Sequence, residues 1–386
     1  MIDRSLAKLE GYRRRIVHEW QMARFRADHR RKKNVLYRWL SQLRTHPPEV
    51  LVGPNFAEYG GVRHHIEAIV RNSILNVELA PPAELTSILT PYDFSETFRE
   101  EFMAYRADGI RVLHSHVFPS FIDWCTERQK DGIRWVHTYH LNYYPEHSNG
   151  NLEPWQAEIN ETLIKKARHA DQCLSVSKWQ VKELRELYGI ESTYLPNGVD
   201  VSLSRRANPA RFIRTYRLEE FILYVGRDDP VKNPGEFAKL AAAMPDRTHV
   251  MIGHGINAQT LATRYGIEAP RNLVFLGGLS QQNVQDAIAA CRVLVVTSRR
   301  EGLPTLVMEG MALGKPIVVP NEPGCMEAIG EGEAGYIYEL GNINDLVEKS
   351  ILAWSDEAIG PAAQERVLRE YDWRVVSKRL DQIYMT

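Results

Sequence analysis

Short apolar runs alternate with segments of helical character along most of the chain, and this alternation is the feature that most limits the fold. The runs form two series. The first comprises residues 50–54, 110–116, 133–138, 172–177 and 192–196, and the second comprises "FILYVG" (221–226), "THVMIG", "NLVFLG", "RVLVVT", "PIVVP" and "GYIYE". Runs without polar alternation are typical of parallel strands with helices on both faces. We therefore expect an α/β fold with two tandem doubly wound, Rossmann-like domains.

The length of the chain agrees with two domains, since 386 residues exceed one usual hydrophobic core. We place a basic helical extension at residues 1–46, a first domain at 47–200, a second at 201–370 and a closing helix at 371–386. The junction at residues 198–219, "NGVDVSLSRRANPARFIRTY", has the composition of a loop. In the closing segment, Trp373, Val376, Leu380 and Ile383 recur at helical spacing and predict a packed face.

The N-terminal extension is strongly basic, with 13 Lys and Arg against four Asp and Glu in residues 1–46. Apolar residues, among them Trp20, Trp39 and Leu43, recur there at helical spacing and predict one or two helices. Such a segment could lie on an anionic membrane surface, or its apolar stripe could pack on the protein itself or on a second subunit. Both interpretations stay open, whereas nucleic acid is a weaker third because no recognised binding motif accompanies the charge.

The cysteines and the hydropathy indicate the compartment. Cys125, Cys173, Cys291 and Cys325 are far apart and form no C-x-x-C, so they indicate neither a disulfide framework nor a zinc site. We find no apolar run long enough to span a bilayer and no signal-peptide core at the N-terminus. We therefore expect a cytoplasmic protein, and peripheral attachment to the inner face of a membrane is one of the roles that stay open for the extension.

The stretch "SRREGLPTLVMEGMALGKPIVVPNEPG" carries two glutamates eight positions apart, Glu301 and Glu309. A strand precedes Glu301, and a helix begins near Pro304 and Thr305, so Glu301 lies in the loop and Glu309 one turn inside the helix. The helix end suits a phosphate, and the two carboxylates could hold hydroxyls beside it. Taken singly, each glutamate is more often a solvated surface charge.

Further polar residues follow other strands, where ligands bind in open parallel sheets. Gly60 and Gly61 permit close backbone approach to a ligand, and His140 lies just beyond a strand. Arg227 and Lys232 share one loop and could clamp a diphosphate. Each residue alone has an ordinary structural explanation, but together they describe a site in a cleft between two domains.

Five segments in order resemble glycosyltransferase family 4, whose members have the GT-B fold. They are "ADQCLSVSKWQVKEL", "YLPNGVD", "ILYVGRDDPVKN", "EGLPTLVMEG" and its sequel "MALGKPIVV". The resemblance covers roughly residues 50–386. It implies retaining transfer of a sugar from a nucleoside-diphosphate sugar to an acceptor hydroxyl, with no required metal or other cofactor. It also implies that the second domain binds the nucleotide sugar, that the first faces the acceptor, and that the last helix returns to the first domain.

The resemblance also assigns roles to residues. Arg227 and Lys232 would hold the diphosphate, Glu309 the ribose hydroxyls and Glu301 the hydroxyls of the donor sugar, while His140 would lie near that sugar. Backbone groups would hold the phosphates, from Gly61 in the first domain and from Gly302, Leu303, Pro304 and Thr305 in the second. The chain departs from the family in its long basic extension and in Pro323-Gly324, where a glycine pair is frequent.

Other functions remain possible at this stage. A glycoside hydrolase would use two carboxylates but no diphosphate clamp. A nucleotide-sugar epimerase of the same fold would need no acceptor, and a non-catalytic nucleotide-sugar-binding scaffold would keep the fold without turnover. Among donors we favour a UDP-sugar slightly, and the acceptor, whether lipid-linked, saccharide or small molecule, is not encoded in any motif we recognise. A second copy of the chain is a further possible partner, since the extension could form a contact between subunits of a homo-oligomer.

Overall fold

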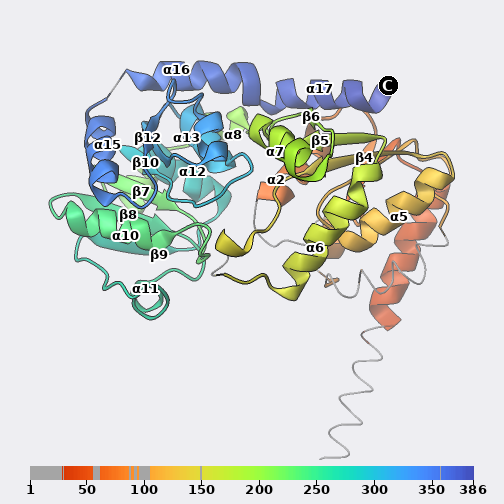
Figure 1. Cartoon of the computed structure of the whole chain (residues 1–386), viewed down its shortest axis with the longest axis horizontal. Helices are drawn as coiled ribbons and strands as arrows, with labels where there is room; N and C mark the ends of the chain where they lie inside the picture. The colour runs from red at the N-terminus through yellow and green to blue at the C-terminus, as the bar shows by residue number, and fades with distance from the viewer. Residues whose placement is uncertain are drawn as a thin grey trace, which may run out of the picture.

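The computed structural model describes residues 28, 30–54, 61–86, 88–90, 94, 105–147, 150–356 and 358–386. Their strands form two parallel six-stranded sheets in succession along the chain (Figure 1). The first sheet has the order β2-β1-β3-β4-β5-β6, and its strands are β1 (Val50–Gly53), β2 (Val77–Leu79), β3 (Val112–Ser115), β4 (Arg134–Tyr139), β5 (Gln172–Ser175) and β6 (Thr193–Tyr194). The predicted α/β class is thereby confirmed.

The second sheet has the order β12-β11-β10-β7-β8-β9. Its strands are β7 (Phe221–Val225), β8 (Thr248–Ile252), β9 (Leu273–Gly277), β10 (Val293–Val295), β11 (Ile317–Pro320) and β12 (Tyr336–Tyr338). Every strand expected from the sequence is present, and β2 is an additional strand of three residues, too short to show a period in the sequence.

Helices cover both faces of each sheet, which explains why the strands read as continuous apolar runs. In β7, Phe221 and Leu223 enter one core and Ile222 and Tyr224 enter the other. The helices of the first half are α2 (Gly61–Asn72), α3 (Ala83–Thr86), α5 (Pro119–Lys130), α6 (Pro154–Lys165) and α7 (Lys178–Tyr188). Those of the second are α10 (Pro234–Ala243), α11 (Ala258–Tyr265), α12 (Gln281–Ala290), α13 (Thr305–Ala312), α14 (Pro323–Ala328) and α15 (Ile343–Ser355).

The segment between the two sheets is helical, so the expectation of a loop at residues 198–219 was wrong. It contains α8 (Val201–Arg205) and α9 (Pro209–Tyr216). Asp200 and Asn208 cap these helices, each accepting a hydrogen bond from a backbone N–H in the first turn, and Pro209 follows as the first residue of α9. The polar residues that give this segment the composition of a loop are therefore helix caps.

The second half of the basic extension packs on the protein itself. Residues 30–45 are helical. Leu36, Trp39, Leu40 and Leu43 are at most 3% exposed and belong to the same core as α5 and β4. Of the two interpretations of the apolar stripe, packing on the chain therefore holds for this half. Residues 1–27 and 29, including Trp20, lie outside the described residues.

The chain ends by crossing from the second sheet back to the first. The helices α16 (Ile359–Arg366) and α17 (Trp373–Met385) lie end to end along one side of the molecule (Figure 1). Trp373, Val376, Leu380 and Tyr384 of α17 enter a core with β1 and α2 of the first half. Among the described residues, no helix has the length and hydropathy that crossing a membrane requires.

Candidate active site

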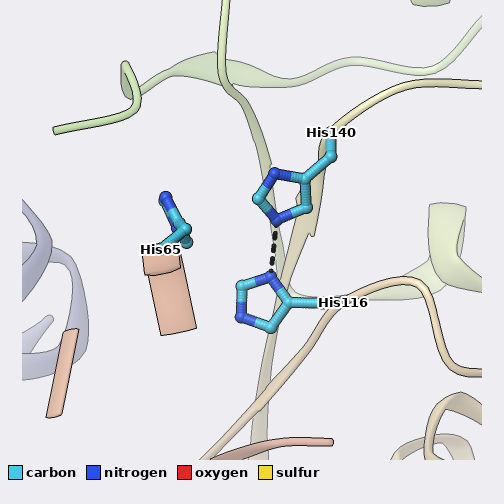
Figure 2. A group of neighbouring side chains, drawn as sticks. All are labelled: His65, His116 and His140. Carbon is cyan, nitrogen blue, oxygen red and sulfur yellow. Dashed lines mark hydrogen bonds between the residues drawn. The ribbon is translucent and has the colours of Figure 1, made fainter. Parts of the chain in front are cut away.

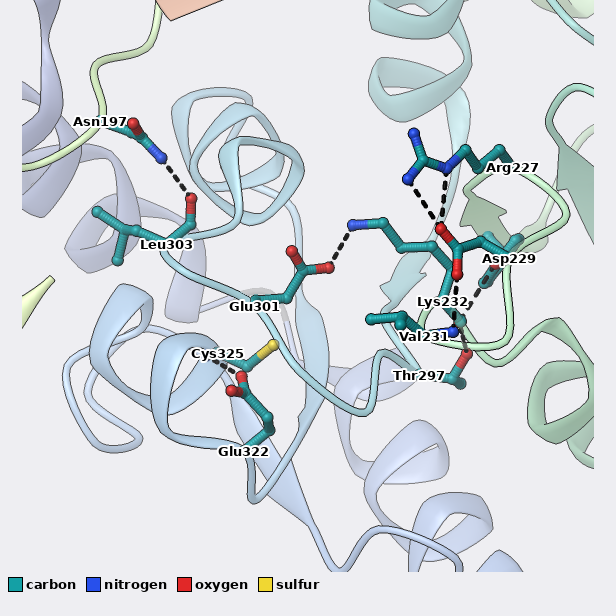
Figure 3. Close-up of polar contacts among 11 residues, drawn as sticks. Asn197, Arg227, Asp229, Val231, Lys232, Thr297, Glu301, Leu303, Glu322 and Cys325 are labelled. Atoms are coloured by element: carbon teal, nitrogen blue, oxygen red, sulfur yellow. Dashed lines mark hydrogen bonds and ion pairs between the residues drawn. The ribbon is translucent and has the colours of Figure 1, made fainter. Parts of the chain in front are cut away.

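The loop between β10 and α13, residues 296–304, carries Glu301 to the lysine predicted to accompany it. One carboxylate oxygen of Glu301 lies 2.5 Å from Nζ of Lys232 (Figure 3). Lys232 comes from the loop that follows β7, so two neighbouring strands of the sheet deliver the pair. The Glu301 side chain is only 13% exposed, which protects the ion pair from solvent screening.

The loop that holds Lys232 is fixed by its own side chains. The Arg227 guanidinium donates to Asp229 at 2.8 and 3.0 Å, and Asp229 also accepts from the Val231 backbone N–H (Figure 3). Thr297 donates to the carbonyl of Lys232 at 3.1 Å. The structure thus brings Lys232 to Glu301, whereas Arg227, 61% exposed, pairs with Asp229 on the same loop.

The first half of the molecule holds the Glu301 loop from the other side. A Cβ atom on Gly302 would lie 2.2 Å from the carbonyl oxygen of His140, so only glycine allows this approach. Trp179 on α7 donates to the Gly302 carbonyl at 2.8 Å. Asn197 donates to the Leu303 carbonyl at 2.8 Å (Figure 3). His140 and the Glu301 loop, predicted to share one site, are therefore in backbone contact.

Two charged groups add to this contact between the halves. The carboxylate of Glu327 accepts from the backbone N–H groups of Lys178 and Trp179 at 2.9 and 3.0 Å, and so caps α7 from the second half. Arg300 pairs with Glu183 on α7 at 2.5 Å, and its guanidinium lies 4.8 Å from the Trp179 ring centre. The start of α7 therefore orients the Glu301 loop.

Glu309 lies on α13, as predicted, and is partly buried. Burial raises its pKa to about 7, and the nearby Gln285 amide opposes part of that rise. The group therefore changes charge near neutral pH, which an exposed glutamate would not do. On the turn before it, Leu303 is buried, and the backbone of Pro304 and Thr305 begins the helix.

The glycines predicted after β1 are only partly described. Gly60 lies outside the described residues, and Gly61 begins α2. Among the described residues, no atom lies within 4 Å of the position that a Cβ on Gly61 would take. The roles assigned to Gly60 and Gly61 in donor binding remain predictions.

Three buried histidines gather where β3, β4 and α2 meet, and the sequence analysis recognised only one of them. His140 follows β4, His116 follows β3 and His65 lies on α2 (Figure 2). Nδ1 of His116 lies 2.9 Å from Nε2 of His140, and the rings of His65 and His140 meet edge to face at 4.9 Å. The sequence signal was present in "HSH" (114–116), at the end of one strand, and in "VHTYH" (136–140), at the end of the next. The two strands are neighbours in the sheet.

The histidines are neutral. Burial, together with the neighbouring histidines, holds the pKa of His116 and His140 well below its usual range, and burial lowers that of His65 to about 4. One ring nitrogen from each of the three lies within 4.8 Å of the others, so this group has the spacing to hold a metal ion. We had expected no metal site, and the function proposed below uses none.

Two successive Rossmann-like halves joined by a returning C-terminal helix define the GT-B class of glycosyltransferases, and sequence comparison identifies the family. The model for "Glycosyltransferase Family 4" matches residues 33–203, and that for "Glycosyl transferases group 1" matches residues 211–371. Together they cover most of the chain, which belongs to glycosyltransferase family 4 and is a glycosyltransferase.

Individual relatives are distant. The chain is 24% identical over 333 residues to the phosphatidyl-myo-inositol mannosyltransferase of Mycobacterium leprae, covering 81% of this chain and 83% of that protein. It is 26% identical over 246 residues to a GDP-mannose-dependent monoacylated alpha-(1-6)-phosphatidylinositol monomannoside mannosyltransferase of Corynebacterium glutamicum, covering 58% of this chain and 64% of the relative.

Solved structures share the fold. Sucrose-phosphate synthase of Thermosynechococcus elongatus superposes with a TM-score of 0.70 at 19% identity, over 87% of this chain and 98% of that one. Anabaena HepE, in complex with UDP and glucose, superposes with a TM-score of 0.69 at 15% identity, over 88% of this chain and 100% of that one.

Proposed function

We propose that the chain is a retaining glycosyltransferase that moves a sugar from a nucleoside-diphosphate sugar to an acceptor hydroxyl. The observation that carries this proposal is the Lys232–Glu301 ion pair beside the N-terminus of α13, with Gly302 in contact with His140 of the other half. A cation and a helix N-terminus suit a diphosphate, and a carboxylate suits the hydroxyls of the attached sugar. Nothing in the structure favours an epimerase or a non-catalytic scaffold over this function.

The ion pair indicates how the donor would be received. A diphosphate would compete with Glu301 for Lys232, and the released carboxylate would then accept hydrogen bonds from the donor sugar. Arg227 lies on the same loop and would exchange its contact with Asp229 for a phosphate in the same way. Glu309, one turn into α13, would accept hydrogen bonds from the ribose hydroxyls.

The reaction then requires charge stabilisation more than a strong base. The bond from the anomeric carbon to the β-phosphate oxygen breaks, a bond from that carbon to the acceptor oxygen forms on the same face, and the acceptor proton passes to the departing phosphate. Lys232, Arg227 and the α13 N-terminus would stabilise the charge that develops on the phosphate. These reaction steps retain the anomeric configuration of the sugar and involve no metal.

The pH dependence of nucleotide affinity tests the role of Glu309, and comparing UDP with GDP tests the choice of base. Calorimetry should show binding of UDP or GDP that strengthens between about pH 6 and pH 8, because ionised Glu309 accepts ribose hydroxyls and the protonated acid does so poorly. The pKa of Glu309 is also higher in the folded protein than in the unfolded chain. The contribution of this group to folding stability therefore falls as the pH rises from the pKa of the unfolded chain toward 7. Glu309→Gln should weaken nucleotide binding at about pH 8. The pH dependence of affinity that remains in this variant should come only from the titration of the nucleotide itself. An unchanged pH profile in this variant would remove the ribose role.

We favour UDP slightly as the nucleotide. HepE was solved with UDP and glucose, whereas the corynebacterial relative is named for GDP-mannose, so both nucleotides belong in the assay. The names of the mycobacterial and corynebacterial relatives contain phosphatidylinositol, which supports a lipid-linked acceptor at a membrane surface for this chain.

The basic extension supports the same acceptor through its charge. In the helix at residues 30–45 the apolar stripe is buried, but Arg30, Arg31 and Arg38 lie on its exposed side. A membrane would therefore meet the arginines and not Trp39. Deleting residues 1–46 is an unsuitable test, because it would remove four core side chains of the first half together with the charge.

Charge reversal at Arg30, Arg31 and Arg38 to glutamate should abolish co-sedimentation with anionic vesicles at low salt. Each basic residue near such a surface contributes about 1 kcal/mol, and the effect is screened as salt is added. The same reversal at Lys165, Lys182 and Arg185, which are exposed on α6 and α7, serves as the matched control. If the wild-type protein ignores vesicles, or if both triple variants lose binding equally, the extension has no specific membrane role.

A further inference from the structure

The hydrogen bond between His116 and His140 has a direction that the surrounding nitrogens determine. Both rings are neutral, so each carries one proton, and either Nδ1–H of His116 donates to Nε2 of His140 or the reverse. In the reverse case the remaining proton of His116 would lie on Nε2. That atom is enclosed by protein and has no hydrogen-bond partner in the part of the chain that the structure describes.

An enclosed nitrogen without a partner costs free energy in either form, but unpaired buried N–H groups are rarer in proteins than unpaired buried acceptors, so the lone pair is the better tolerated form. The first direction is therefore favoured, with Nδ1–H of His116 as donor. It leaves a lone pair on Nε2 of His140 to receive that hydrogen bond, and the proton of His140 must then lie on Nδ1.

His65 is compatible with the same direction. Among the described residues, neither of its ring nitrogens has a partner at full hydrogen-bond geometry, but the Asn197 amide acts on the ring and raises its pKa, as an oxygen that accepts from an imidazole N–H does. One ring nitrogen of His65 faces the space that its ring shares with His116 and His140 (Figure 2). In the tautomer that places the His65 N–H on that nitrogen, a lone pair on Nε2 of His116 provides an acceptor, whereas a second N–H would repel the first.

The His116 ring is held in place from behind. The ring of His114 lies 4.5 Å from it at an angle of 33°. His114 in turn lies 2.5 Å from the hydroxyl of Tyr384 on α17 and 2.7 Å from that of Thr138 on β4. The C-terminal helix therefore supports the plane in which His116 meets His140.

We infer that His116 is a positioning residue that fixes His140 in the tautomer with its proton on Nδ1. His140 then offers an N–H to substrate, so the group that it contacts is an oxygen with a lone pair, such as a sugar hydroxyl or a phosphate oxygen. In this state Nδ1 cannot serve as a general base or as a metal ligand. The inference rests on the proposed function only for the identity of that oxygen.

The tautomer can be read directly by ¹⁵N NMR of imidazole-labelled full-length protein, with His140→Gln used to assign the signal. We expect His140 to be protonated on Nδ1 and unprotonated on Nε2, and His116 to show the same tautomer. His116→Asp places only an acceptor at the position of Nδ1, so it should move the His140 proton to Nε2. His116→Asn keeps an N–H donor there and should preserve the wild-type tautomer.

Turnover should follow the tautomer. We expect His116→Asp to lower kcat by about 10- to 100-fold, the usual range for losing the group that orients a functional side chain, and His116→Asn to retain most of the turnover. UDP or GDP affinity should change little in both, because Lys232 and Glu309 lie in the second half. Absence of nucleotide binding in the wild type would count against the proposed function but leave the NMR result valid.

Three results would overturn the inference. One is a wild-type spectrum with the His140 proton on Nε2, which needs no variant and stands even if His116→Asp fails to fold. Another is a folded His116→Asp protein with the flipped tautomer and undiminished kcat. The third is stoichiometric Zn²⁺ binding that shifts the ¹⁵N signals of all three histidines, since the cluster would then be a ligand set.

Discussion

Lys232→Ala is expected to lower turnover by about 100-fold or more at saturating donor, the usual scale for losing one group that stabilises transition-state charge. The lysine lies 2.5 Å from Glu301, whose loop leads into the start of α13. Arg227→Ala should have an effect of the same order, because its loop presents both cations to the diphosphate. Steady-state kinetics with purified variants measure both.

Lys165→Ala is a suitable control, since Lys165 forms a similar ion pair with Glu161 at 2.8 Å on the surface of α6. It should leave turnover unchanged. Near-normal kcat in Lys232→Ala and in Arg227→Ala would show that neither cation stabilises the leaving diphosphate, and the assignment of this loop would fail.

Gly302→Ala is expected to lower turnover by about 100-fold and to weaken nucleotide binding by a smaller factor, since the Gly302 backbone is only one of the predicted phosphate contacts. The added methyl would meet the His140 carbonyl oxygen at 2.2 Å, and backbone cannot yield as a flexible side chain can. The two halves would have to separate at the site, and displacements of about 1 Å are enough for losses of this size. The nucleotide contacts proposed for Lys232 and Glu309 are confined to the second half and would survive.

Gly235→Ala provides the comparison for this change. Gly235 lies in α10, and its added methyl would approach side-chain atoms of Ile267 and Tyr265 and no backbone. It should retain turnover. If Gly302→Ala weakens nucleotide binding as much as it lowers kcat, the contact with His140 is not what separates binding from transfer.

The strands and the Glu301 site could be predicted because they depend on short-range sequence features. A buried parallel strand needs a continuous apolar run, and a loop between strand and helix places Glu301 and Lys232 at the same sheet edge. The junction at 198–219 was mispredicted for a related reason. Asp200, Asn208 and Pro209 favour both turns and helix starts, and only the capping contacts distinguish the two.

Contacts between distant segments could not be predicted in the same way. Nothing local to Glu327 shows that it caps α7, or that Trp179 binds the Gly302 carbonyl, since each pair is more than a hundred residues apart. The stripe through Trp39 has the same helical spacing whether its partner is a membrane or a core. His116 went unrecognised because its role depends on a ring from a neighbouring strand.

The most direct test of the proposed function is release of nucleoside diphosphate from UDP-glucose and from GDP-mannose, with and without acceptors. Phosphatidylinositol vesicles, myo-inositol and simple glycosides are suitable acceptors. We expect release from one donor that requires an acceptor, is lost in Lys232→Ala and gives a product with the anomeric configuration of the donor. Interconversion of the donor sugar without any acceptor, or nucleotide binding with no release from any donor and acceptor pair, would contradict it.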